Sequence, residues 1–251
     1  MKEVFVTRVL GIDIGGSGMK AAEVDITTGE MLTERFRIET PKPATPEAMA
    51  EVVAQLTAHY SWTGPVGVGF PGVIQDGIVR TAANLDKSWV DVDGDSVFTE
   101  AAGCDVVMIN DADAAGLAEA RFGAAKDIAG TVILLTLGTG IGSAVFTNGQ
   151  LVANTEFGHL ELNGKIAEDR ASSRVKEEKD LSFKKWGKQV EKVLQELEKL
   201  FWPKLFVLGG GISKEFDDFK EFLDDVHTPI VAAELRNEAG IVGAALAHAS
   251  G

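Results

Sequence analysis

One order of predicted elements occurs twice in this 251-residue chain, and this repetition limits the possible folds more than any other feature. The order is an apolar strand, a glycine loop, a second strand, a tight hairpin and a third strand. The first copy consists of Val9–Ile14, Gly15–Gly18, Lys20–Ile26, Thr28-Gly29 and Met31–Ile38, and the second of Thr131–Leu137, Gly138–Gly142, Ser143–Phe146, Asn148-Gly149 and Leu151-Val152. Coincidence among glycine-rich β segments is the alternative. The matching order favours an internal duplication with two related lobes and a cleft between them.

The other predicted elements alternate between strands and helices, which is typical of an α/β protein. Strands are expected at Pro65–Phe70, Cys104–Ile109, Leu205–Leu208 and Ile230-Val231, and helices from Thr45-Pro46 onward, at Ala112–Phe122, through most of Arg170–Phe201 and at Ala239–Ala249. Gly77–Trp89 and Asn154–Asn163 are predicted as loops, and Ser213 as a helix cap. We predict an N-terminal lobe of residues 1–111, completed by the terminal helix 239–251, and a C-terminal lobe of residues 112–238.

Composition excludes several classes of protein. The net charge of −14 argues against a general binder of nucleic acids or anionic membranes. Cys104 is the single cysteine, so the chain has neither an internal disulfide nor a multi-cysteine zinc site, which fits a reducing compartment. The first ten residues are too polar for a signal peptide, and three glycines interrupt the longest apolar run. We expect a soluble cytoplasmic protein.

The first glycine loop has the composition of a phosphate-binding hairpin. Gly15, Gly16 and Ser17 follow a strand that carries Asp13 near its end, and Lys20 comes next. Glycines let backbone N–H groups approach a phosphate closely, a carboxylate can hold Mg²⁺, and a lysine adds a positive charge. A glycine-rich β-turn with a solvated aspartate explains the same residues equally well.

Two groups of polar residues are candidates for chemistry on a sugar. Asn110 and Asp111 follow a buried strand, and Asp111 could accept a proton from a hydroxyl that attacks phosphorus, although a helix-capping carboxylate is an equal alternative. Glu156, His159 and Glu168 offer donors and acceptors that suit a sugar. Without other evidence, a solvated surface loop is the simpler interpretation of these three residues.

Further glycine loops and a basic segment point to a polyanionic ligand. Thr139 and Gly140, and likewise Gly210 and Gly211, follow buried strands and resemble the first loop in position. Between Lys165 and Lys204 there are eleven basic and eight acidic residues, and Lys184 and Lys185 stand in the basic cluster. A solvated amphipathic helix is the alternative to a binding track for a polyanion.

The chain resembles the ROK family of sugar kinases. The segments that carry the resemblance are GIDIGGSGMK, VGVGFPG, TAANL, INDADAAGLAE, LTLGTGIGSAV, EFGH and VLGGGIS, in family order over nearly the whole chain. The resemblance implies a duplicated actin-like, hexokinase-like (ribonuclease H-like) fold and a homodimer. It implies that Asp111 is the catalytic base, that Gly72, Asn84, Asn110, Glu156, His159 and Glu168 contact the sugar, and that Asp13 with Gly15, Gly16, Thr139 and Gly140 serves Mg²⁺ and phosphate.

One departure from the family pattern is informative. Many members follow their Gly-His motif with a cysteine-rich zinc-binding segment, whereas here LELNGKIAEDRASSRVKEEKDLS follows Gly158-His159 without a cysteine, so no zinc is expected. This variant is similar to that of bacterial polyphosphate glucokinases, which transfer a phosphoryl group from inorganic polyphosphate to glucose, some also using ATP. The alternatives are an ATP-dependent gluco- or mannokinase and, less favoured, a sugar-sensing regulator, because only eight residues precede Val9 where family regulators carry a DNA-binding motif.

Overall fold

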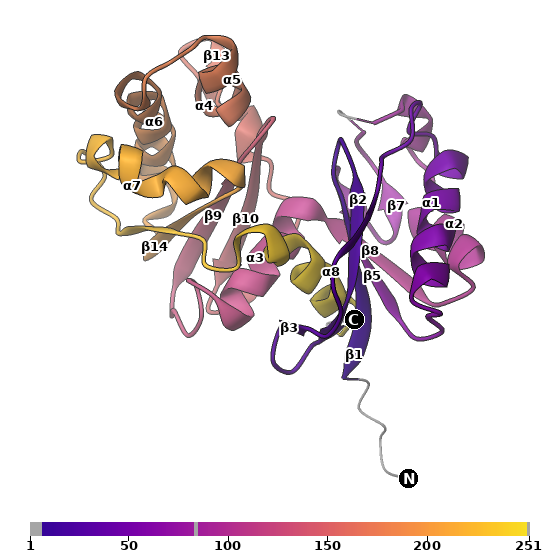
Figure 1. Ribbon diagram of the computed structural model, residues 1–251. Coiled ribbons are helices and arrows are strands. Elements are labelled where there is room, and N and C mark those ends of the chain that lie inside the picture. Colours follow the sequence, from indigo (N-terminus) through magenta and orange to yellow (C-terminus); the bar gives the residue numbers. More distant parts are fainter. Residues whose placement is uncertain (1–6, 83–84, 250–251) are drawn as a thin grey trace. The chain divides into compact units, whose positions relative to one another are not determined.

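The computed structural model describes residues 7–82 and 85–249. These residues form two compact units (Figure 1). Unit 1 contains the described residues up to Ala118 together with those from Glu238 onward, and unit 2 runs from Glu119 to Asn237. The division falls within α3 (Asp111–Phe122), so this helix contributes residues to both units.

Unit 1 is built on a six-stranded mixed sheet of order β3-β2-β1-β5-β8, in which β4 also pairs with β2. Its strands are β1 (Arg8–Ile14), β2 (Met19–Asp25), β3 (Glu30–Met31), β4 (Phe36–Ile38), β5 (Val66–Phe70) and β8 (Val106–Asn110). β1 and β2 are antiparallel, whereas β5 runs parallel to β1, and β8 runs parallel to β5. Parallel strands end at the same edge of a sheet, so the residues that follow β1, β5 and β8 share that edge.

The helices of unit 1 begin and pack as the local sequence dictates. α1 (Pro46–His59) has Thr45 as its N-cap and proline at its first position, as predicted, and it packs with α2 (Gly94–Ala102). α8 (Ala239–Ala249) lies on β1 and β5. A side chain at Gly11 or Gly67 would put its Cβ 2.1 Å or 1.8 Å from a carbonyl oxygen of α8, so these glycines permit the close approach of helix and sheet.

Unit 2 repeats the sheet topology of unit 1. Its five strands are β9 (Thr131–Leu137), β10 (Ile141–Thr147), β11 (Gln150–Val152), β14 (Leu205–Gly209) and β15 (Ile230–Ala232), in the order β11-β10-β9-β14-β15. An antiparallel meander is again followed by two strands parallel to the first. Asn148 and Gly149 have φ angles of 52° and 77°, as the predicted type I′ hairpin requires. The predicted duplication is confirmed.

A long amphipathic helix covers the core of unit 2. α6 (Phe183–Phe201) buries Trp186, Val190, Leu194 and Leu197 in one cluster with apolar residues of β9 and β14. The indole N–H of Trp186 donates to the carbonyl oxygens of Ala171 and Ser172, both at 3.1 Å. These bonds attach α6 to the junction between α4 (Glu168–Ala171) and α5 (Ser173–Glu178).

Several predicted boundaries differ from the structure. Met31–Ile38 is two short strands rather than one. The predicted loop Gly77–Trp89 contains β7 (Ile78–Val79), which pairs with β6 (Ile74–Gln75), and the 3-10 turn Lys87–Trp89. The predicted loop Asn154–Asn163 contains the 3-10 turn Phe157–His159 and β12 (Glu161–Leu162), which pairs with β13 (Lys165–Ile166).

The predicted cap role of Ser213 is wrong. Its hydroxyl donates to the carbonyl oxygen of Gly210 at 2.8 Å, inside the 3-10 turn Gly211–Glu215 that precedes α7 (Phe216–Phe219). A serine that caps a helix accepts an N–H bond at the helix start, whereas this one closes a turn on the preceding glycine. None of the helices in the described ranges is both long and apolar enough to cross a lipid bilayer.

Candidate active site

The β1–β2 hairpin places a carboxylate, an ammonium group and backbone N–H groups at the edge of the unit 1 sheet. The N–H of Gly15 donates to the carbonyl oxygen of Gly18 at 3.1 Å, which closes the loop. Lys20 Nζ lies 3.2 Å from Asp13 Oδ2, and both side chains are partly exposed. Within the described part of the chain, the N–H groups of Gly16 and Ser17 have no hydrogen-bond acceptor, so both can donate to an anion.

Asp13 also lies against the first turn of α8. A Cβ at Gly240 would be 2.9 Å from the Asp13 carboxyl carbon, so the carboxylate occupies a place that the helix dipole favours for an anion. Mg²⁺ is commonly held by one or two carboxylates together with water and substrate phosphates. A single hard oxygen donor beside an open glycine loop therefore fits Mg²⁺, and Asp13 is the residue that would hold it.

Asn110 and Asp111 form the start of α3, directly after β8. The Asn110 amide oxygen accepts from the N–H groups of Ala112 and Asp113 at 2.9 and 3.0 Å, so Asn110 caps the helix. Asp111 is the first helical residue, and its Oδ1 accepts from the N–H of Ala112 at 2.8 Å. The carboxylate is half-buried at the sheet edge where β1 and β5 also end.

Gly72 supports Asn110 from the loop after β5. Its carbonyl oxygen accepts from Asn110 Nδ2 at 3.1 Å, and its N–H donates to the carbonyl oxygen of Phe70 at 2.9 Å. The structure thus brings Gly72 and Asn110 together, and the second Asn110 amide hydrogen has no acceptor among the residues that the structure describes. Asn84, the other predicted sugar contact of this unit, lies outside the described residues.

The three polar residues predicted in unit 2 lie close together. Glu168 Oε2 is 3.4 Å from the N–H of Ile141, and a Cβ at Gly140 or Gly158 would be 2.6 Å or 3.2 Å from that oxygen. Glu156 precedes the Phe157–His159 turn, and its carbonyl oxygen accepts from the N–H of His159 at 3.0 Å. Burial raises the pKa of Glu156, with His159 lowering it and Glu168 raising it further.

Two glycine loops adjoin each other in unit 2. Gly138–Gly140 follows β9, Gly210 and Gly211 follow β14, and these two strands are parallel neighbours. Gly210 has a φ of 84°, and a Cβ there would be 2.5 Å from the carbonyl oxygen of Leu137. The exposed Gly210 and Gly211 therefore lie beside the loop that carries Thr139 and Gly140, where N–H groups can gather around phosphate oxygens.

The basic residues of unit 2 divide into paired and unpaired groups. Lys188 is bound by Glu191, Asp224 and Asp225, and its hydrogen bonds to Asp224 and Glu191 raise its pKa, so it is not available to a polyanion. Lys184 and Lys185, at the start of α6, are exposed and form no ion pair with any residue in the described ranges.

Sequence reasoning missed how the loop Gly138–Gly140 is held. The Ser173 hydroxyl and the N–H of Arg174 donate to the carbonyl oxygen of Gly138 at 2.9 and 3.2 Å, and Arg174 Nε donates to that of Thr139 at 2.9 Å. α5 is therefore attached to the loop at its first turn. The only signal in the sequence was the basic character of Arg174, which does not indicate a partner 35 residues away.

Comparisons with known proteins agree with these arrangements. Residues 9–180 match the ROK family. The chain is 53% identical over 238 residues to a polyphosphate glucokinase of Mycobacterium tuberculosis, which covers 94% of this chain and 89% of the relative. The crystal structure of an inorganic polyphosphate/ATP-glucomannokinase from Arthrobacter sp. strain KM aligns with a TM-score of 0.93 and 50% identity, covering 97% of this chain and 99% of that one.

A more distant neighbour extends the comparison. The crystal structure of a ROK family glucokinase from Streptomyces griseus, in complex with glucose and AMPPNP, aligns with a TM-score of 0.84 and 26% identity. The alignment covers 97% of this chain and 100% of that chain. The duplicated sheet topology, the three glycine loops and the residues at the strand ends all occur in a chain whose match to the family spans most of its length. The chain belongs to the ROK family.

Proposed function

We propose that this protein transfers a phosphoryl group from inorganic polyphosphate to the 6-hydroxyl of glucose, giving glucose 6-phosphate. The observation that carries the proposal is the 53% identity, over 94% of the chain, to a polyphosphate glucokinase. The residues that the transfer needs also stand at strand ends: a carboxylate after β8, glycine loops after β1, β9 and β14, and a group of polar side chains beside Ile141.

In this proposal Asp111 is the general base. Its carboxylate takes the proton of the 6-hydroxyl as the hydroxyl oxygen forms a bond to the terminal phosphorus. The bond between that phosphorus and the bridging oxygen breaks, and the leaving group is a polyphosphate shortened by one phosphate. Asn110 acts as a positioning residue, because it caps α3 and so fixes the backbone of Asp111.

Polar side chains and backbone groups at the positions described above would bind the sugar. Glu156, His159 and Glu168 supply carboxylates and an imidazole for the sugar hydroxyls, which need donors and acceptors at fixed positions. Asn110 can add its remaining amide hydrogen, while Gly72 acts through Asn110 because its own backbone groups are engaged. Asn84 stays a predicted sugar contact on the basis of its motif alone.

The donor phosphates would be held by backbone N–H groups and positive charges. Gly15, Gly16, Ser17 and Lys20 serve this role in unit 1, and Thr139, Gly140, Gly210, Gly211, Lys184 and Lys185 serve it in unit 2. A sugar kinase implies a divalent metal, for which we propose Mg²⁺ at Asp13. When bound, this ion supplies positive charge that offsets the charge on the phosphoryl oxygens.

A coupled assay of glucose 6-phosphate formation tests the proposal, with polyphosphate or ATP as the sole donor. We expect glucose-dependent turnover with polyphosphate that requires Mg²⁺ and is abolished by a chelator. Turnover with ATP alone would show a hexose kinase and remove polyphosphate as donor. Absence of turnover with both donors would contradict the enzyme assignment.

A second donor and a second sugar are supported by one comparison. The Arthrobacter glucomannokinase, 50% identical to this chain, is described as acting with polyphosphate or ATP. We therefore propose that ATP and mannose are alternative substrates of this protein. The same assay, repeated with each pair of donor and sugar, measures kcat/KM for all four combinations, and no turnover with mannose would limit the enzyme to glucose.

We also propose that the chain is a homodimer. Leu200, Phe201 and Trp202, at the end of α6, are 58%, 39% and 82% exposed, and large exposed apolar groups that lie together often mark protein contacts. Light scattering coupled to size-exclusion chromatography is expected to give twice the chain mass of 26.7 kDa. Trp202→Glu should shift the equilibrium towards the monomer if this surface is the interface, and a monomeric wild-type protein would overturn the proposal.

A further inference from the structure

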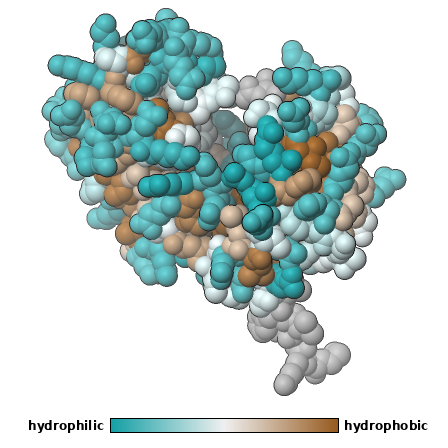
Figure 2. Space-filling model, viewed as in Figure 1, coloured by the Kyte–Doolittle hydropathy of each residue, from teal (hydrophilic) through white to brown (hydrophobic). Residues whose placement is uncertain are grey.

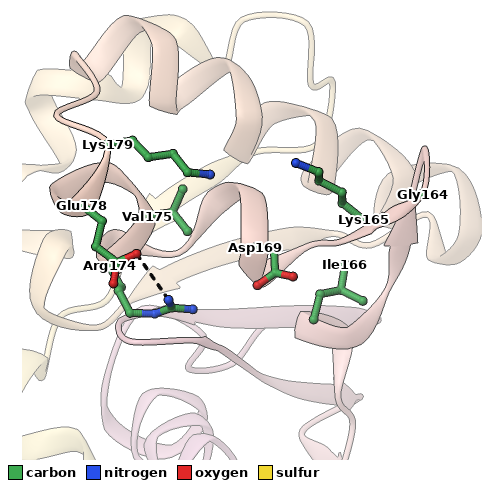
Figure 3. A pocket seen from close by; sticks show the side chains of 8 residues that line it. All are labelled: Gly164, Lys165, Ile166, Asp169, Arg174, Val175, Glu178 and Lys179. Atoms are coloured by element: carbon green, nitrogen blue, oxygen red, sulfur yellow. Dashed lines mark hydrogen bonds and ion pairs between the residues drawn. The ribbon is translucent and has the colours of Figure 1, made fainter.

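A cavity of about 470 Å³ lies in unit 2, between the β12–β13 hairpin and helices α4 and α5 (Figure 3). It is formed by the segment that follows Gly158-His159, and its size lies within the usual range for small-molecule sites. Figure 2 shows that the surface of this part of the chain is mainly hydrophilic. None of the residues assigned above to sugar or phosphate lines it, so the proposed function leaves the cavity without a role.

Positive charges converge on this cavity. The ammonium groups of Lys165 and Lys179 point towards it from opposite sides (Figure 3). In the described part of the chain neither lysine has an acidic partner, whereas Glu178 is occupied by Arg174 at 3.5 Å. Ammonium groups that have no acidic partner attract an anion, and two of them on one cavity attract it more strongly than one.

The wall of the cavity is continuous with a proposed phosphate-binding loop. Arg174 lines the cavity and at the same time donates from Nε to the carbonyl oxygen of Thr139 at 2.9 Å. Its backbone N–H donates to the carbonyl oxygen of Gly138 at 3.2 Å. Arg174 therefore connects the loop Gly138–Gly140 directly to the wall of the cavity.

The lining favours a chain of phosphates over a nucleotide base. Three cationic side chains, two carboxylates and two aliphatic side chains line the cavity, and the lining has no aromatic ring on which a base could stack. A phosphate chain needs only positive charge and hydrogen-bond donors at intervals, which lysines supply.

We propose that this cavity is a subsite for the distal phosphates of a long polyphosphate donor, held by Lys165 and Lys179. The inference rests on the proposed function and adds a chain-length preference to it. Donors too short to extend from the glycine loops, such as tripolyphosphate and ATP, do not use the subsite. Asp169 lines the same cavity, and its carboxylate repels a bound anion and so weakens its binding.

The decisive variant is Lys165→Gln/Lys179→Gln, assayed with long-chain polyphosphate, tripolyphosphate and ATP. At low ionic strength the KM for long-chain polyphosphate should rise about tenfold, because each exposed charge pair contributes a modest free energy. The KM values for glucose, tripolyphosphate and ATP should not change, and neither should kcat. At high salt the difference should disappear, since salt screens exposed charges.

Two further variants distinguish an effect of the cavity lysines from an effect of lowering the positive charge of the whole protein. Lys126→Gln/Lys192→Gln removes the same charge from exposed residues of unit 2 that do not line the cavity, and should leave every KM unchanged. Asp169→Asn removes the opposing carboxylate and should lower the KM for long-chain polyphosphate. A change of the same size in the control double variant, or equal effects on long and short donors, would overturn the subsite.

The outcomes also distinguish this inference from the proposed function. If the wild type phosphorylates glucose with polyphosphate but the Lys165→Gln/Lys179→Gln variant keeps the wild-type dependence on chain length, the subsite is wrong and the function stands. If the wild type shows no turnover with any polyphosphate, the function fails. In that case equilibrium titration with long-chain polyphosphate still tests the cavity, and equal affinity for wild type and variant overturns it.

Discussion

Asp111 has its backbone fixed by a neighbouring cap. The amide oxygen of Asn110 accepts the N–H bonds that a helix start would otherwise leave open, and Asn110 is itself bonded to Gly72. The carboxylate of Asp111 thus stands at a defined point of the sheet edge, half-buried, after the last parallel strand of unit 1. Asn110 already caps α3, so the helix start does not depend on the Asp111 carboxylate alone, which supports the general-base role proposed above.

Replacement of this carboxylate is the sharpest test at the scale of one residue. Asp111→Asn keeps the size and polarity of the side chain but removes the proton acceptor, so kcat should fall by about 10²–10⁴-fold. The dissociation constant for glucose, measured by calorimetry, should change little. A kcat within a few-fold of the wild-type value would show that another group accepts the proton.

Glu156 allows a prediction about pH and stability. Burial raises its pKa above the usual value of 4.5, so its ionisation costs more in the folded than in the unfolded chain. Its stabilising contribution is complete below pH 4.5 and is lost as the pH rises through the raised pKa. Glu156→Gln cannot ionise, so the melting temperature of the variant relative to wild type should increase between acidic and neutral pH.

The same variant should lose affinity for glucose, because a carboxylate acceptor is replaced by an amide. Thermal unfolding across the pH range and the KM for glucose together check both effects. Glu161→Gln offers a matched control, since Glu161 is an exposed carboxylate. A constant difference in melting temperature at all pH values would show that ionisation of Glu156 is not coupled to folding.

At the scale of elements, the glycine loops depend on backbone geometry. Gly210 has a φ of 84°, and the space for its Cβ is already occupied by the backbone of Leu137. Gly210→Ala should therefore cost about 1–3 kcal/mol in the free energy of unfolding. Gly211→Ala is the matched control, because a Cβ at Gly211 meets nothing within 4 Å. Chemical denaturation of both variants measures the difference, and equal stability would contradict the strained turn.

The start of α6 carries a separate prediction. Lys184 and Lys185 are exposed and unpaired among the described residues, unlike Lys188 on the same helix. Lys184→Gln/Lys185→Gln should raise the KM for polyphosphate at low salt, and the effect should shrink as salt screens the interaction. If these lysines bind near the transferred phosphate, short donors are affected as well, in contrast to the cavity lysines. An unchanged KM would remove the helix start from the donor site.

At the scale of the whole molecule, two units with separate cores share one chain. Each unit has its own apolar cluster beneath its own sheet. The chain passes from unit 1 to unit 2 within α3 and returns to unit 1 just before α8. A ligand that binds only the folded state stabilises the protein by about 2.7 kcal/mol at a concentration a hundred times its dissociation constant. Saturating glucose should therefore raise the melting temperature clearly.

Asp111→Asn and Glu156→Gln should differ in how much glucose raises their melting temperatures. Asp111→Asn should keep most of the glucose-induced shift, because its role is to accept a proton, whereas Glu156→Gln should lose much of it. Sucrose at the same concentration is a control for nonspecific effects of sugar. An equal shift with glucose and sucrose would mean that glucose has no specific site.

Much of the fold followed from local patterns. Apolar strands that end in glycines, the Asn148-Gly149 turn and the Thr45-Pro46 helix start were readable because each depends on the preferences of a few adjacent residues. The short strands β7 and β12 were missed, since strands of two residues have too little periodicity and exist only through their partner strands.

The sequence by itself determined the repeated order of strands and glycine loops, the acid after β8 and the basic excess in one segment, because periodicity and turn chemistry are local. Tertiary structure decided which groups meet. Asn110 is bonded to a carbonyl 38 residues away, Arg174 to one 35 residues away, and Glu168 reaches an N–H 27 residues away. Such contacts depend on how distant segments pack together. So does the difference between Lys188, which is paired, and Lys165 and Lys179, which have no acidic partner among residues 7–82 and 85–249.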